Sequence, residues 1–217
     1  PASQLHVDEG DGGHGATVDE GDGGYYVYLR GRGTPVRIRY NAPVTLTFSL
    51  LAVAVLLVDQ ITGGRLVAGA FSIGPSLDFA NPLQWPRLLT HAMGHANWAH
   101  LMGNFAFVLL LGPILEEKYG SASLLVMMLV TALVTGLINI LIMPTGLLGA
   151  SGIVFMMILL VSFTNIRAGE IPLTFILVVL LFLAREIVGA LREDSIAQFA
   201  HIAGGVCGSL FGFTRRG

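Results

Sequence analysis

Charged residues are scarce in this chain and unevenly distributed. Only 12% of its 217 residues are Asp, Glu, Lys or Arg, about half of the roughly 25% that soluble domains carry. Residues 1–43 hold ten of the 26 charges (12 basic and 14 acidic), which leaves 16 for the other 174 residues. A stretch so poor in charge could not cover a water-exposed surface, and we therefore expect its surroundings to be lipid.

The low net charge and the single cysteine each argue against a class of protein. The formal net charge is −2, which disfavours a nucleic-acid-binding protein whose affinity comes from counterion release. Cys207 is the single cysteine, which excludes an intrachain disulfide framework and a metal site built from several cysteines. We expect no cofactor and no metal.

Residues 1–43 differ in composition from the rest. The heptapeptide Val-Asp-Glu-Gly-Asp-Gly-Gly occurs at 7–13 and again at 18–24, and its glycine and acid content predicts a disordered polar tail. A calcium loop is an alternative, although the EF-hand ligand spacing is absent. On either side of Gly31–Gly33, residues 25–40 alternate between apolar and polar side chains. This pattern predicts a small hairpin or a basic segment lying on lipid headgroups.

From Val44 onwards, long apolar runs alternate with short loops. The expected fold class is an all-α polytopic membrane protein with six transmembrane helices over 44–213, followed by a basic C-terminus at 214–217. The six runs are Val44–Ile61, Trp98–Leu115, Ser121–Met143, Ser151–Phe163, Ile171–Leu191 and Ala197–Phe213. The distribution of Lys and Arg between the loops predicts that both termini are cytoplasmic.

The fourth run is too short to cross the membrane. A helix over 151–163 would extend only about 20 Å at 1.5 Å per residue, whereas the hydrocarbon core is roughly 30 Å thick. One end of this helix must therefore stop inside the membrane, and its N-terminal end reads Gly149-Ala150-Ser151-Gly152. The sequence predicts a serine at a helix N-terminus below the membrane surface.

Four polar residues are expected at similar depth in the outer half of the bilayer. His100 and Asn104 lie four residues apart on one face of the second helix, Ser151 opens the fourth, and His201 lies near the outer end of the sixth. Polar groups at this depth cost free energy, so their presence indicates a function. The set suits acyl transfer by a Ser–His dyad, with Ser151 as nucleophile and His201 as base. The side chains of His100 and Asn104 and the backbone N–H of Ser151 would then stabilise the oxyanion.

Small residues form a stripe along the sixth run. They recur every four positions, at Ala200, Gly204, Gly208 and Gly212. Such a stripe allows a neighbouring helix to approach closely, and Gly149 and Gly152 offer a matching thin surface on the fourth helix. Phe155 lies one turn after Ser151, so its ring is expected to contact His201 and fix the imidazole by packing.

Four motifs in order and spacing resemble the rhomboid family of intramembrane serine proteases. They are the segment 90–104 (THAMGHANWAHLMGN), Glu116 with Gly120, Gly149-Ala150-Ser151-Gly152, and Ala200-His201-Ile202-Ala203-Gly204. The resemblance covers about residues 44–213 and implies the same dyad and oxyanion hole. It also implies that His95 and Arg87 belong to the external loop and that Glu116 belongs to a structural polar cluster.

The same resemblance implies a setting and a substrate class. The protein would be a multi-pass protein of a bacterial inner or plasma membrane, and its partners would be membrane proteins with a transmembrane helix. Two positions depart from the family pattern. Trp85-Pro86-Arg87 stands where many members have an adjacent Trp-Arg pair, and Phe155 stands where many bacterial members have Tyr.

Three other interpretations of the polar residues remain open at this point. His91 and His95 are four residues apart and could form a metal pair, although the Glu of an HExxH site is absent. A non-catalytic rhomboid-like protein that binds membrane clients would be expected to have lost Ser151 or His201. A transporter is disfavoured because the runs show no internal repeat and no interior carboxylate.

Overall fold

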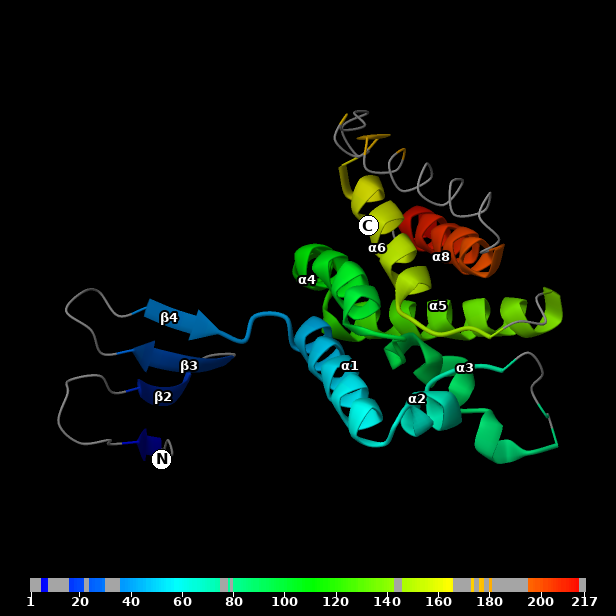
Figure 1. Cartoon of the computed structure of the whole chain (residues 1–217). Coiled ribbons are helices and arrows are strands. Elements are labelled where there is room, and N and C mark those ends of the chain that lie inside the picture. The colour runs from blue at the N-terminus through cyan, green and yellow to red at the C-terminus, as the bar shows by residue number, and fades with distance from the viewer. Residues whose placement is uncertain are drawn as a thin grey trace. The chain divides into compact units, whose positions relative to one another are not determined.

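The computed structural model describes residues 5–7, 16–21, 24–29, 36–74, 78, 80–142, 146–165, 173, 176–177, 180 and 195–214. The chain divides into two compact units, Pro1–Pro43 and Val44–Gly217 (Figure 1).

The first unit is an antiparallel sheet whose strands follow one another in chain order. The strands are β1 (Leu5–Val7), β2 (Ala16–Gly21), β3 (Gly24–Leu29) and β4 (Val36–Arg39). The β3–β4 pairing, in which Val27 lies opposite Ile38, confirms the hairpin predicted over 25–40. The all-α expectation is wrong for this unit.

The prediction of disorder is also wrong where the chain forms β1 and β2. In the second copy of the heptapeptide, residues 18–21 complete β2 and Gly24 begins β3, with Gly21 paired to Gly24. The β2–β3 pairing therefore extends to Gly21 and Gly24, the adjoining ends of the two strands. A Gly- and Asp-rich composition is common to disordered segments and to hairpin turns, which is why composition alone misled the prediction.

In the second unit the regular elements of the described residues are helices. The long ones are α1 (Pro43–Ile61), α4 (Trp98–Tyr119), α5 (Ser121–Ile142), α6 (Ser151–Asn165) and α8 (Ser195–Thr214). The connection from α1 to α4 contains the short helices α2 (Arg65–Ala70) and α3 (Arg87–Thr90) and two 3-10 turns, Pro82–Gln84 and His91–Met93.

Of the six predicted spans, the first three are confirmed as helices long and apolar enough to cross a membrane. These are α1, α4 and α5, with 19, 22 and 22 residues. The short fourth run forms α6, whose apolar part is Ser151–Ser162, and the sixth forms α8. The predicted span Ile171–Leu191 lies largely outside the described residues.

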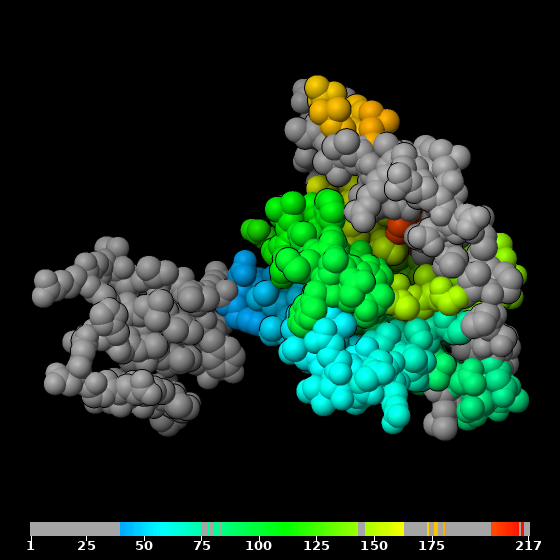
Figure 2. Space-filling model, viewed as in Figure 1, coloured from blue at the N-terminus to red at the C-terminus, as the bar shows by residue number. Residues whose placement is uncertain are grey.

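The beginning of α1 is held by a side chain from α4. Buried Glu116 accepts hydrogen bonds from the N–H groups of Val44 (2.9 Å) and Thr45 (3.0 Å) and from the Thr45 hydroxyl (2.8 Å). Pro43 has no N–H to offer, so Glu116 satisfies donors of the first turn that have no partner within the helix. The two helices lie next to each other on the face seen in Figure 2.

The core is centred on α6, which packs against α4, α5 and α8 (Figure 1). Residues 152–158 of this helix are all buried, and so are Leu160 and Ser162. A helix surrounded by other helices needs apolar residues around its whole circumference. This explains why α6 shows no polar face despite its short length.

Candidate active site

α4 begins with a capped turn that positions two polar side chains. Asn97 is the N-cap, and its side chain accepts a 2.9 Å hydrogen bond from the N–H of His100. Asn104 follows one turn later and is buried. The two side chains therefore lie on one face of α4, as their four-residue spacing predicts.

Both side chains lie against Gly149, two residues before Ser151. Gly149 has a φ of +111°, and a methyl group added there would lie 2.7 Å from His100 Nε2 and 3.6 Å from Asn104 Nδ2. Glycine is needed at this position both for its backbone conformation and for the close approach of the imidazole.

One expectation for Gly149 needs correction. We expected Gly149 to contribute to a thin surface of the fourth helix toward the sixth, but it faces His100 and Asn104 of α4 instead. The reason is that α6 begins only at Ser151. Gly149 belongs to the preceding loop, where its positive φ rather than the helical repeat sets its direction.

The loop before Ser151 is anchored by the segment that precedes α4. Ile73 and Leu147 exchange two backbone hydrogen bonds of 2.9 Å, and the N–H of Gly149 donates to the carbonyl of His91 (2.9 Å). The N–H of Ala150 lies 3.4 Å from His95 Nε2. These three contacts hold the chain up to the residue before the serine. Sequence reasoning missed Ile73 and Leu147, because backbone pairing carries no residue signature.

His91 and His95 are buried supports of this loop rather than a metal pair. His91 Nδ1 lies 3.1 Å from the Arg87 carbonyl and its Nε2 3.5 Å from the Thr135 hydroxyl. His95 Nδ1 lies 3.2 Å from the Met93 carbonyl, and its Nε2 contacts Asn104. All four ring nitrogens thus have protein partners, and the described residues contain no group of three His, Cys, Asp or Glu suited to a metal ion.

Both imidazoles are neutral near pH 7. Burial lowers the pKa of His91 to about 4 from an ordinary 6.5, although its hydrogen bond to the Arg87 carbonyl opposes the shift. Burial also lowers the pKa of His95 to about 4, and the neighbouring His100 acts in the same direction. A buried imidazole avoids the charged form unless an opposite charge lies nearby.

α8 packs closely on α6 through its glycines. A methyl group added at Gly204 would overlap the carbonyl of Gly152, and one at Gly208 would overlap the carbonyl of Met156. The close approach predicted from the small-residue stripe is therefore present at these two glycines.

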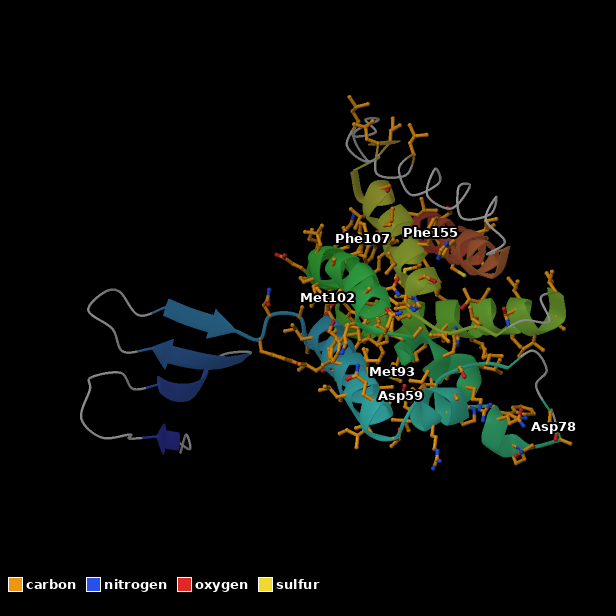
Figure 3. All side chains as sticks on the ribbon, in the orientation of Figure 1. Asp59, Asp78, Met93, Met102, Phe107 and Phe155 are labelled. Carbon is orange, nitrogen blue, oxygen red and sulfur yellow. The ribbon has the colours of Figure 1, made fainter. Side chains whose placement is uncertain are left out.

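His201 enters the interface between α6 and α8 beside Phe155. The two rings are stacked, with centroids 4.7 Å apart and planes inclined by 6°, and His201 is buried. Figure 3 shows Phe155 on the side of α6 that faces α8. The expected ring contact is thus present, one helical turn from Ser151. His100 and Asn104 of α4 thus lie against the loop that leads to Ser151, and His201 of α8 contacts α6, the helix that Ser151 begins.

Comparison with known proteins identifies the family. Residues 82–217 match the Rhomboid domain family, a range that includes α4, α6 and α8. The chain is 30% identical over 174 residues to a protein named Rhomboid protease GlpG from Yersinia enterocolitica, with 79% of this chain and 62% of the relative covered.

Two further relatives carry the same name. The one from Pectobacterium atrosepticum is 30% identical over 175 residues, with 79% of this chain and 62% of the relative covered. The one from Haemophilus influenzae is 25% identical over 130 residues, with coverage of 58% and 68%. The match therefore spans less than two thirds of the length of the Yersinia and Pectobacterium relatives. With its apolar helices, the chain is an integral membrane protein that belongs to the rhomboid family.

Proposed function

We propose that this chain is an intramembrane serine endopeptidase that cleaves transmembrane or juxtamembrane segments of membrane proteins. The relatives named Rhomboid protease support this activity class. The observation that carries the proposal is the convergence at the start of α6. His100 and Asn104 lie against Gly149, while His201 stacks on Phe155 one turn after Ser151.

In the proposed reaction Ser151 and His201 act as a dyad. The Ser151 oxygen attacks the scissile carbonyl carbon while its proton passes to His201. Collapse of the tetrahedral intermediate breaks the C–N bond, and His201 returns the proton to the leaving amine. A water molecule then hydrolyses the acyl-enzyme, with His201 again acting as base. The role of Phe155 is to keep the imidazole in one orientation by stacking.

The proposed oxyanion hole uses donors from two helices. Asn104 offers an N–H of its amide, His100 its Nε2–H, and Ser151 its backbone N–H. The N-terminus of α6 adds a partial positive charge at the same place. Donors held in position before the reaction are more effective than water because they need no reorganisation as the negative charge develops.

The loop charges and the relatives support a proposal for the membrane setting. We place both termini in the cytoplasm and the chain in a bacterial inner membrane, with substrates that carry a transmembrane helix. In this orientation Ser151 opens α6 from the outer side, so a substrate helix would have to unwind locally to reach it.

A fluorophosphonate probe tests the proposal directly. We expect the purified protein in detergent to be labelled at Ser151, as located by peptide mass spectrometry, and to cleave a single-span reporter. Ser151→Ala should lose both properties while keeping its melting temperature. An intact, folded wild-type protein that neither reacts nor cleaves would favour the alternative of a non-catalytic client-binding protein.

A further inference from the structure

We propose that His95 is a positioning residue of the oxyanion site, which holds the Asn104 amide and the loop before Ser151 in a fixed relation. This inference rests on the proposed function, because it assigns His95 a role in the same reaction. His95 itself does not touch the reacting atoms in this proposal.

The His95 ring is buried and packed against two other rings. Its side chain has 0% exposure. The His100 ring lies edge-on with its centroid 4.9 Å away, and the Phe105 ring lies similarly at 5.5 Å. His95 follows the turn His91–Met93 and precedes α4, so it lies between the external loop and the helix that carries Asn104.

Two backbone groups determine which ring nitrogen carries the hydrogen. Nδ1 lies 3.2 Å from the Met93 carbonyl, which can only accept, so Nδ1 must donate. Nε2 lies 3.4 Å from the Ala150 N–H, which can only donate, so Nε2 must accept. A neutral ring with its hydrogen on Nδ1 satisfies both contacts, and an imidazolium satisfies only the first. The lowered pKa of His95, about 4, agrees with the neutral form.

This tautomer also determines how the Asn104 amide is oriented. Asn104 Nδ2 lies 3.2 Å from His95 Nε2, and an accepting nitrogen favours the NH₂ group over the amide oxygen. A reversed amide would place its oxygen against the lone pair of Nε2. With one N–H donated to His95, the second N–H of Asn104 is left for the oxyanion. His95 therefore makes Asn104 present a donor instead of an acceptor.

A single atom thus connects the two sides of the site. His95 Nε2 contacts the side chain of Asn104, which belongs to α4, and the backbone N–H of Ala150, the residue immediately before Ser151. Losing this acceptor would free the amide to rotate and would loosen the loop, so the oxyanion donors would no longer keep their geometry. Misplaced catalytic groups lower the rate of the chemical step more than they weaken substrate binding.

The test compares His95→Leu with His95→Gln in the full chain. Leu fills similar space without an acceptor, whereas the amide oxygen of Gln can replace Nε2. On a single-span reporter we expect His95→Leu to lose roughly tenfold or more in kcat with little change in KM. His95→Gln should recover most of this loss. In the Asn104→Ala background, the same Leu substitution should cost about threefold or less, because residues that act as a unit are not additive.

Two results would overturn the positioning role. They are a wild-type kcat for His95→Leu or a His95→Gln enzyme as slow as His95→Leu. An equal loss from His95→Leu with and without Asn104 would show that His95 does not act through the Asn104 amide. If His95→Leu does not fold, the test is the ¹⁵N chemical shifts of the His95 imidazole in the wild-type protein. The His95 signals are those that disappear in the spectrum of His95→Gln. Hydrogen on Nδ1 between pH 6 and 8 supports the proposal, and hydrogen on Nε2 refutes it. Wild-type protein that neither labels nor cleaves refutes the proposed function, while the shifts still decide the His95 contact.

Discussion

The Phe155 ring lies nearly parallel to the His201 imidazole, with 4.7 Å between centroids and 6° between planes. Phe155 comes from α6, which Ser151 begins, and His201 comes from α8. Aromatic contacts of this kind contribute about 0.5–1.5 kcal/mol beyond the burial of their area. In the proposed dyad the base is thus oriented by a ring on the helix of its nucleophile.

Replacing Phe155 should affect the rate through the mobility of His201. We expect Phe155→Leu to keep the fold and to lose roughly tenfold or more in kcat, because a mobile base spends less time in the productive geometry. Phe155→Tyr should remain active, since it keeps the ring. Single-turnover cleavage by the three proteins, at temperatures equally far below their melting points, measures the effect. Equal rates for Leu and Phe would show that the stacking does not position the base.

Ser151 and His201 should behave as one unit. Ser151→Ala and His201→Ala are each expected to abolish cleavage, and the double variant should be no slower than either single one, because both groups act in the same step. The check is reporter cleavage over long incubations, with melting temperature as the control for folding. Measurable turnover by a purified single variant would exclude the dyad.

Gly149→Ala should slow the reaction far more than backbone strain explains. The added methyl would lie 2.7 Å from His100 Nε2, which must displace the imidazole, and we expect a loss of about tenfold or more in kcat. Gly120→Ala is the matched control, because Gly120 also has a positive φ of +81° but nothing within 4 Å of an added methyl. Both variants should lose about 1–3 kcal/mol of stability. A Gly149 variant that matches the Gly120 variant in kcat contradicts the close contact.

Gly208→Leu should destabilise the α6–α8 interface. Even a methyl group at Gly208 would overlap the Met156 carbonyl, and a larger side chain forces the helices apart, which costs about 1–3 kcal/mol or more. Gly103→Leu is the control, since Gly103 lies in a helix with open space around it. Melting temperature in detergent should fall for Gly208→Leu and stay near the wild-type value for Gly103→Leu. Equal melting temperatures would place the stripe outside the interface.

The buried loop histidines should make stability depend on pH. The pKa of His95 is about 4 in the folded protein against 6.5 for an ordinary imidazole, so between these values the unfolded chain binds more protons than the folded one. Stability is therefore complete above pH 6.5 and falls as the pH approaches 4, by about 3 kcal/mol for this residue. His95→Gln should show a shallower fall in melting temperature from pH 7 to 4.5. Parallel curves for the two proteins would contradict the shift.

Local patterns explain what the sequence predicted well. The predicted span Val44–Ile61 differs from α1 by one residue, and the second and third spans begin where α4 and α5 begin. The length of an apolar run can be read from consecutive residues of the sequence. The four-residue spacing that puts His100 and Asn104 on one helix face, or Gly204 and Gly208 in one stripe, is equally local.

What was missed depends on contacts between distant segments. The sequence placed His95 in the external loop as a supporting residue, or in a metal pair with His91, and nothing near it in sequence indicates that its Nε2 meets both Asn104 and Ala150. Likewise, the pairing of Ile73 with Leu147 uses backbone groups that every residue has. Gly149 was assigned to the wrong neighbour because the helical repeat was extended past the residue where α6 begins.

The capping of α1 by Glu116 has a consequence for the order of folding. The chain is synthesised from its N-terminus, so α1 is made long before the residue that accepts hydrogen bonds from its first turn, which lies 72 positions after Val44. Until then the N–H groups of Val44 and Thr45 depend on water or lipid headgroups. Insertion of the first helix and fixing of its end are therefore separate events, and the second waits until α4 has arrived.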